Sequence, residues 1–328
     1  MRRRNLNALA LTSVGLLVIL CTGCASGAGT SQWSGLEKTN LTVGAVPVGD
    51  EAGLYIAKDE GLFAKVGLNV TIDSIVSSET ATKEQNNGTF DVTAGNSVSY
   101  IQDQVTGAAN LEIVAEGSLM QPNNQALYTL PGSPIKSIAD LKGARIGVNA
   151  PDNIGTLLIS SVLEEHGVSP KDVHFVTVNF PLMGEDLEKH VIDVAWLPEP
   201  FGSIDQAAVG LEELCDLDQG ATANFPVGWY VVTKNWAKEN PRTLAAFLYA
   251  LREGQQIADT DRSAVQMAME RLPKPYTVPP QIAAVMSLED YPLSIAPDID
   301  RSRVQRVADA MYQFQMLTHP FQVSSMLG

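Results

Sequence analysis

The chain has 328 residues, 45% of them hydrophobic, and a formal net charge of −15. Such an acidic balance argues against nucleic acid as a partner. The length and the hydrophobic content suit a globular protein of two ordinary domains and exclude a disordered chain.

The N-terminal segment predicts export. Arginines at positions 2–4 precede an apolar run that is too short for a membrane span and ends in small residues, which is typical of a removable signal peptide over residues 1–23. Small residues before Cys24 resemble the lipobox of bacterial lipoproteins, which implies a lipid on Cys24, although Cys21 stands where that motif usually has leucine. The alternative is an ordinary signal peptide with a cysteine near its cleavage site.

A tether is expected next. Residues 24–37 are rich in glycine, serine and alanine and show no hydrophobic period, as in a flexible linker. We therefore expect a protein anchored to the outer face of the cell membrane through a lipid on Cys24. With Cys21 removed and Cys24 acylated, only Cys215 remains, so no intramolecular disulfide is expected.

From residue 41 onward, short apolar strands alternate with helical stretches. LTVGAV, LNVTIDSIV, FDVTAG and LEIVAEG have the pattern of strands, and the segments between them have that of helices. This alternation predicts a mostly parallel sheet with helices on its faces.

A second set of units begins near Gln125. QALYTL, RIGVNA, HFVTVNF and DVAWL are the expected strands, and a helix over residues 154–166 is expected to end at Gly167. GWYVVTK is one more strand. The remainder is predicted to be helical, with its last helices around 280–290 and 301–317.

Several segments together resemble the periplasmic-type substrate-binding proteins of bacterial importers for nitrate, sulfonates, taurine and thiamine-pyrimidine precursors. They are VPVGDEAGLYIAKDEGLFAKVGLNVTI, GTFDVTAGN, DLKGARIGV, VIDVAWLPEPF and GWYVVTKNWAKENP. The resemblance covers nearly the whole chain after the tether. It implies a two-lobed, doubly wound α/β fold of the type II binding-protein class, with two chain crossings and a ligand cleft between the lobes.

The resemblance also implies the organisation and the partners. Lobe 1 is expected to comprise residues 38–123 plus 235–328, and lobe 2 residues 124–234. The implied function is capture of a small ligand and its delivery to an ABC importer, whose membrane permease and ATPase are the partners. We expect a monomer, no catalytic activity, no cofactor and no metal.

In such a fold the ligand lies outside the carboxyl ends of the strands, so residues at strand ends are the candidate contacts. They are Pro47, Val48, Ser77, Ser78, Asn96, Ser97, Met120, Gln121, Asn149, Asn153, Gly155, Thr156, Phe180, Trp196, Glu199, Phe225 and Trp229.

Some of these candidates have a structural alternative. Ser78 and Ser97 precede helices, where serine is a usual N-cap. The stretch APDNIGTLL either offers free helix amides to an anion or is a capped helix in which Gly155 permits close packing. Trp196, Trp229 and Phe225 either belong to the core or form an aromatic wall of the cleft.

Glu199 follows a strand and stands between two prolines. A carboxylate at the mouth of the cleft accepts hydrogen bonds from amines, amides or ring N–H groups and repels a bare anion. None of the candidates is lysine or arginine, which favours a small polar organic ligand with a donor or a positive centre. The alternative is a solvated acid that caps the helix FGSIDQAAVG.

Enzymes on the same fold, the pyrimidine synthases and the chorismate dehydratases, are the less favoured interpretation, because the synthases' cysteine-rich motif is missing and both work inside cells. The thiamine-precursor branch also usually has a tryptophan and a histidine near the first strand, where this chain reads GAVPVGDEAGLY. A ligand-sensing receptor is a further alternative that the sequence does not separate from transport.

Overall fold

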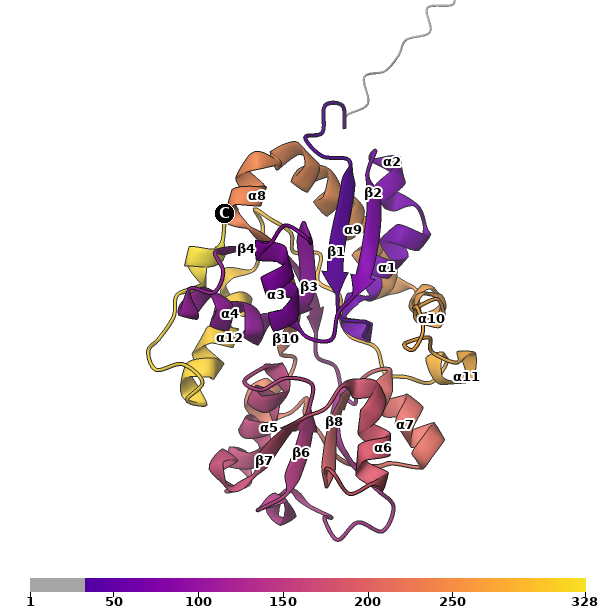
Figure 1. Cartoon of the computed structure of the whole chain (residues 1–328), viewed down its shortest axis with the longest axis vertical. Coiled ribbons are helices and arrows are strands. Elements are labelled where there is room, and N and C mark those ends of the chain that lie inside the picture. The colour runs from indigo at the N-terminus through magenta and orange to yellow at the C-terminus, as the bar shows by residue number, and fades with distance from the viewer. Residues whose placement is uncertain (1–32) are drawn as a thin grey trace, which may run out of the picture. The chain divides into compact units, whose positions relative to one another are not determined.

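The computed structural model describes residues 33–328. The predicted signal peptide, Cys21 and Cys24 lie outside the described residues. Residues 35–328 fold into one unit that contains two five-stranded sheets, each with helices on its faces (Figure 1). No helix among the described residues is long and apolar enough to cross a membrane.

The first sheet has the strand order β2-β1-β3-β10-β4. Its strands are β1 (Asn40–Ala45), β2 (Asn69–Ser74), β3 (Val92–Asn96), β4 (Leu111–Leu119) and β10 (Pro226–Thr233). Strands β1, β2 and β3 pair in parallel, and β10 pairs antiparallel with both β3 and β4. Four of the five strands therefore run in one direction, as the alternation of strands and helices predicts.

The second sheet repeats this arrangement in the order β7-β6-β8-β5-β9. Its strands are β5 (Gln125–Thr129), β6 (Arg145–Val148), β7 (His174–Thr177), β8 (Val194–Pro198) and β9 (Glu212–Asp216). Here β5 is the strand of opposite direction. The chain passes between the sheets after β4 and again after β9, so the expected fold class, with its two crossings, is confirmed.

One strand lies in the other sheet from the one expected. The prediction placed residues 226–233 in lobe 2, because they follow the lobe 2 strands along the chain, but β10 occupies the first sheet between β3 and β4. The second crossing therefore comes before β10 rather than after it. The sheets place the return to lobe 1 near Phe225 instead of residue 235.

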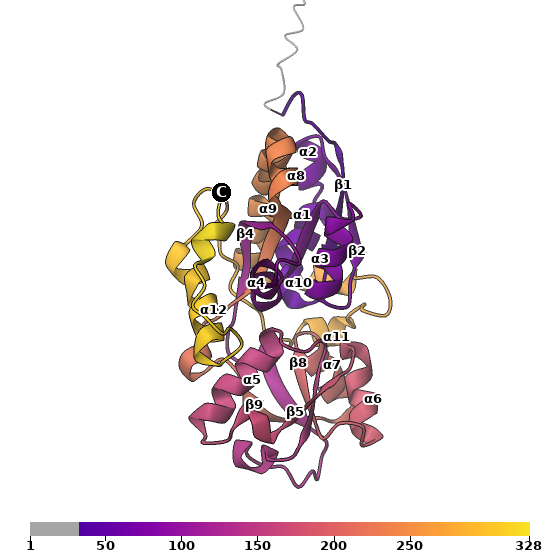
Figure 2. The ribbon, with the colours of Figure 1, turned by 60° about the vertical axis from the view of Figure 1, so that its left-hand side comes forward.

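Helices cover both faces of each sheet (Figures 1 and 2). Those that follow strands of the first sheet are α1 (Ala52–Asp59), α2 (Leu62–Lys65), α3 (Ser78–Asn86), α4 (Ser97–Thr106), α8 (Lys234–Glu239), α9 (Pro241–Thr260), α10 (Arg262–Glu270), α11 (Pro280–Ala283) and α12 (Arg301–Gln313). Those of the second are α5 (Ile154–Glu165), α6 (Met183–Glu188) and α7 (Phe201–Val209). Helix α1 packs on α9, α12 packs on α4 and β10, and α11 contacts α7.

The expected helix around 280–290 is mostly wrong. Helix α11 has four residues, and the chain beyond it is irregular, with isolated bridges from Asp290 and Ile295 to strand β4. Asp290 exchanges both backbone hydrogen bonds with Leu119 of β4, at 2.9 and 3.2 Å, so pairing with the sheet takes the place of the last helical turn.

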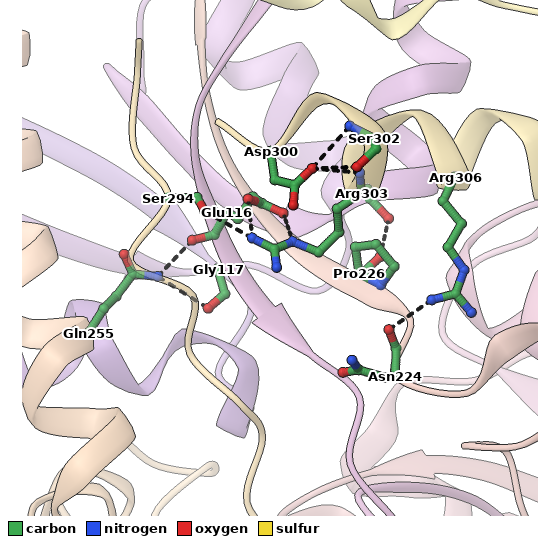
Figure 3. A network of polar contacts seen from close by, with 11 residues as sticks. Glu116, Gly117, Asn224, Pro226, Gln255, Ser294, Asp300, Ser302, Arg303 and Arg306 are labelled. Atoms are coloured by element: carbon green, nitrogen blue, oxygen red, sulfur yellow. Dashed lines mark hydrogen bonds and ion pairs between the residues drawn. The ribbon is translucent and has the colours of Figure 1, made fainter. Parts of the chain in front are cut away.

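An ion pair between the partly exposed Arg303 and the buried Glu116 ties α12 to the first sheet (Figure 3). Arg303 donates to both carboxylate oxygens of Glu116 on β4, at 2.6 and 2.8 Å, and to the Ser294 hydroxyl at 2.9 Å. The side chain of Gln255 donates to the backbone oxygen of Glu116 at 2.7 Å. Both oxygens of the buried Glu116 carboxylate are thus paired with the Arg303 guanidinium, and α9 holds the backbone of the same residue through Gln255.

Candidate functional site

A small cavity lies between the two sheets, at the ends of their strands. Its volume is about 30 Å³, and both lobes contribute to its wall. From lobe 1 the lining residues are Val46, Val48, Asp50, Glu51, Gly95, Asn96, Val227 and Gly228, and from lobe 2 they are Gln125, Asn149, Ile154, Phe180, Trp196 and Pro198. No lysine, arginine or histidine is among these described residues.

Five predicted contacts line this cavity: Val48, Asn96, Asn149, Phe180 and Trp196. They come from four strand ends and a loop after β7, which is why a rule about strand ends finds them. Pro47 lies beside them, on a smaller adjoining cavity that Phe180 also lines.

The serines at the starts of α3 and α4 form hydrogen bonds within lobe 1. Ser77 caps α3 by accepting from the Thr80 amide at 3.4 Å, and the cap of α4 is Asn96, which accepts from the Ser99 amide at 2.8 Å. Ser78 and Ser97 are therefore not the caps. The Ser78 hydroxyl accepts from the side chain of Asn96 at 3.0 Å, and the Ser97 hydroxyl donates to a backbone oxygen of β10 at 3.0 Å.

The N-terminus of α5 is capped, and the amide side chains beside it form hydrogen bonds with one another and with lobe 1. The side-chain oxygen of Asn153 accepts from the Thr156 amide at 3.3 Å, and its side-chain amide donates to Asn149 at 2.6 Å. Asn149 in turn donates to the Val76 carbonyl of lobe 1 at 3.1 Å. Gly155 packs against the ring of Trp196, where an added Cβ would lie 2.3 Å from a ring carbon.

Glu199 is buried at the junction of the lobes and is not solvated. It accepts hydrogen bonds from the amide and the hydroxyl of Ser203, at 3.2 and 2.6 Å, so it caps α7. It also accepts from the Ser287 amide at 3.4 Å, and its own backbone oxygen accepts from Gly49 of lobe 1 at 3.0 Å. Burial raises the pKa of Glu199, and the bonds from Ser203 and Ser287 oppose that rise.

The predicted contacts at the chain crossings and in the core of β10, namely Met120, Gln121, Phe225 and Trp229, are also absent from the cavity wall. Met120 and Phe225 are buried at the two chain crossings, where the Met120 amide donates to the Phe225 carbonyl at 2.9 Å. Gln121 follows them at the first crossing, and Trp229 lies inside β10 with its ring fully buried. These residues join the lobes or fill the core.

The wall includes three polar residues that were not predicted from the sequence: Asp50, Glu51 and Gln125. The two acids form the short 3-10 turn Gly49–Glu51 that leads from β1 into α1, and Gln125 begins β5 on the opposite lobe. Asp50 and Glu51 could have been identified from the sequence. They are adjacent acids between β1 and the apolar run of α1, at a strand end where the ligand is expected.

The two acids of this turn have raised pKa values. Burial raises the pKa of Asp50 to about 6, although the Ser118 hydroxyl donates to it at 2.6 Å. Burial, with repulsion from Asp50, raises the pKa of Glu51 well above its ordinary value, and the nearby Tyr230 hydroxyl opposes the rise. Neither carboxylate oxygen of Glu51 accepts a hydrogen bond of normal geometry from the described residues.

A third buried acid, Glu289, lies nearby, and its surroundings favour the protonated form. Burial and repulsion from Asp50 raise the pKa of Glu289 well above its ordinary value. The Tyr291 hydroxyl lies 2.9 Å from a Glu289 oxygen and 2.9 Å from the Gly49 carbonyl, yet it has one proton to donate. A protonated Glu289 supplies the second hydrogen, so Tyr291 can satisfy both contacts.

The acids at the turn predict a pH dependence. The melting temperature of the unliganded protein is expected to fall as pH rises. The reason is that the carboxyls of Asp50, Glu51 and Glu289 bind protons more tightly in the folded state than in the unfolded state. Their contribution is fully present below the unfolded pKa of about 4. It is lost as pH rises through the folded pKa, about 6 for Asp50. Melts across this interval should show a smaller loss in Asp50→Asn, and equal losses would contradict the assignment.

The described residues offer no evident centre for metal or thiol chemistry. No group of three or more histidine, cysteine, aspartate or glutamate residues within 33–328 could hold a metal ion. Cys215 is half-buried on β9, and burial raises the pKa of its thiol to about 11, far from the range of a reactive thiolate.

The chain is similar in sequence to proteins that are already known. A family model described as NMT1/THI5 like matches residues 49–261. The nitrate/nitrite binding protein NrtA of Nostoc sp. is 25% identical over 252 residues, which are 71% of this chain and 57% of that protein. A 4-amino-5-hydroxymethyl-2-methylpyrimidine phosphate synthase of Uromyces fabae is 25% identical over 226 residues, 61% of each chain.

Among solved structures, the alkanesulfonate-binding protein SsuA from Xanthomonas axonopodis pv. citri superposes with a TM-score of 0.73 at 16% identity, over 89% of this chain and 98% of that one. This likeness confirms the expected two-lobed binding-protein fold. The chain spans only 57% and 61% of the lengths of the two curated relatives, so their activities do not pass to it directly.

Proposed function

Because this chain belongs to the NMT1/THI5-like family, we propose that it is an extracytoplasmic solute receptor, which captures a small polar organic ligand between its lobes and delivers it to an ABC importer. The observation that carries the proposal is the cavity at the strand ends, whose wall is shared between two lobes joined by two crossings. Such a site can close around a solute by hinge motion.

The contacts across the cavity support a closing motion. Lobe 1 reaches lobe 2 through the Asn149–Val76 bond, the Gly49–Glu199 backbone bond and the Ser287–Glu199 bond. Two of these three bonds involve Glu199. The rings of Phe201 and Tyr276 also meet edge-on across the lobes, with 6.3 Å between their centroids, so opening the lobes would break apolar contacts as well as hydrogen bonds. Residues 120–124 and 217–225 at the crossings are the hinge in this proposal.

The partners and the location belong to the same proposal. The receptor would be exported, held at the outer face of the cell membrane by a lipid on Cys24 and the tether, and would act as a monomer. Its closed form would dock on a membrane permease that a separate ATPase drives. The names of the nitrate/nitrite-binding and alkanesulfonate-binding relatives support a binding role.

The alternative is an enzyme, since one relative is named as a pyrimidine phosphate synthase. Binding without turnover separates the two. The purified protein is incubated in turn with nitrate, bicarbonate, methanesulfonate, methylammonium and an aminopyrimidine, and its melting temperature and each compound's integrity are measured. We expect at least one compound to raise the melting temperature and to be recovered unchanged. A ligand at a hundred times its Kd stabilises by about 2.7 kcal/mol. Consumption of any compound by the protein alone would refute the receptor proposal.

A further inference from the structure

Two adjacent buried acids, Asp50 and Glu51, line the cavity without a basic partner. Glu51 is 0% exposed, precedes α1 and does not cap that helix with its side chain. Asp50 accepts a hydrogen bond from the Ser118 hydroxyl at 2.6 Å. Both residues line the cavity. Acids in the first turn of a helix are common on surfaces, where water solvates them, but here water is largely excluded.

Two other buried acids have a base as partner, whereas Glu199 and Glu289 are buried with hydroxyl or amide donors instead. Glu116 has Arg303 at 2.6 Å, and Asp91 has Lys38 at 2.6 Å. None of the ion pairs between residues 33 and 328 includes Asp50 or Glu51. A buried carboxylate without a counter-charge costs several kcal/mol, so these acids either stay protonated or meet a positive charge from outside the chain.

An independent observation on the other lobe points to the same ligand chemistry. Gln125 is 1% exposed and lines the cavity, and its side-chain oxygen has no hydrogen-bond partner among the described residues. Asn96 and Asn149 line the cavity too, but their side-chain oxygens already accept from Ser99 and Asn153. The described wall also carries an unpaired donor, the indole N–H of Trp196. The unpaired oxygens of Glu51 on one lobe and Gln125 on the other outnumber it, so the unused groups are mostly acceptors.

On the premise that this cavity is the ligand site of the proposed receptor, we infer that Asp50 and Glu51 bind a positively charged, hydrogen-bond-donating group of an organic ligand, of the primary ammonium or amidinium class. Gln125 accepts a further hydrogen bond from the same group. An anion would meet two acids and no base on the described wall. A quaternary ammonium would leave the acceptors unpaired, because it has no N–H. The apolar part of the ligand would lie against Trp196 and Phe180.

The test is a matched panel on the purified protein at pH 7.5, with melting temperature and calorimetry as readouts at constant ionic strength. Methylammonium, acetamidinium and benzylammonium carry charge and donors, tetramethylammonium carries charge alone, and nitrate, bicarbonate and methanesulfonate are anions. We expect a donor-bearing cation to bind, and Glu51→Gln to weaken its binding about tenfold or more, as the loss of a charged hydrogen bond implies.

The control is Glu60→Gln, at the exposed far end of α1, which should bind as the unaltered protein does. The melting temperature of unliganded Glu51→Gln shows whether the variant folds. Binding of anions without cations, binding of tetramethylammonium as tight as methylammonium, or unchanged cation binding by Glu51→Gln would each overturn the inference and leave the receptor proposal standing. The same inference is wrong if no cation of the panel binds. Turnover of a bound cation would instead refute the receptor proposal alone.

Discussion

Replacing Arg303 by methionine is expected to lower the free energy of unfolding by about 3 kcal/mol, the lower end of the cost of breaking a buried ion pair. The loss is expected because the Glu116 carboxylate would remain without its counter-charge. Glu116 is 0% exposed on β4, and its two carboxylate oxygens accept from Arg303 (Figure 3). Without the guanidinium, β4 would carry an unpaired charge in the core, and α12 would lose its link to the sheet.

Urea unfolding of the purified protein measures this loss. Arg301→Met is the matched control, because Arg301 is exposed at the start of the same helix, and its change is expected to stay within about 0.5 kcal/mol. The double variant Glu116→Gln/Arg303→Met should be more stable than Arg303→Met, since it removes the uncompensated charge. A loss below about 1 kcal/mol in Arg303→Met would show that the pair is no stronger than a surface ion pair.

The order of strands and helices could be predicted from sequence because it depends on local patterns. The helix after β6 begins at Ile154 and reaches Gly167 in a left-handed turn, as its period and glycine indicate. The place of β10 could not be predicted this way. Its partners β3 and β4 are distant in the chain. The local sequence of an apolar strand does not indicate which of two sheets the strand joins.

The site was predictable to the level of the strand ends. Val48, Asn96, Asn149, Phe180 and Trp196 share one cavity because the carboxyl ends of strands converge there. Which polar atoms remain free is a different question, since it depends on contacts between residues far apart in the chain. The side chain of Asn149 is occupied by a bond to Val76, for example, and that bond exists only once the lobes have met.

Glu199 illustrates the same limit. From sequence it could be a ligand contact or a solvated helix cap, and in the structure it caps α7 while buried at the junction of the lobes. Its hydrogen bond from Ser287 depends on α11 reaching α7, which no local pattern indicates. The acids that line the cavity are instead Asp50 and Glu51, at the end of the first strand.

Replacing Gly155 by alanine is expected to destabilise the protein by about 1–3 kcal/mol, the usual cost of an overpacked core. An added Cβ would lie 2.3 and 2.6 Å from carbons of the Trp196 ring. Phe180 packs edge-on against that ring, with 5.4 Å between the ring centroids, and Phe201 stacks on Phe180 at 5.2 Å, so the clash would displace the ring toward the cavity that it lines. Alanine gains up to about 1 kcal/mol over glycine within a helix. That gain is smaller than the packing cost.

The measurable consequences are two, because Trp196 and Phe180 also line the cavity. Urea unfolding should show the loss of stability, and ligands that raise the melting temperature of the unaltered protein should bind Gly155→Ala more weakly, since the displaced ring narrows the cavity. A double-mutant cycle with Trp196→Leu isolates the clash, as Gly155→Ala should cost less once the ring is gone. If Gly155→Ala is instead as stable as the unaltered protein, helix propensity outweighs packing at this position, and the ring is free to move.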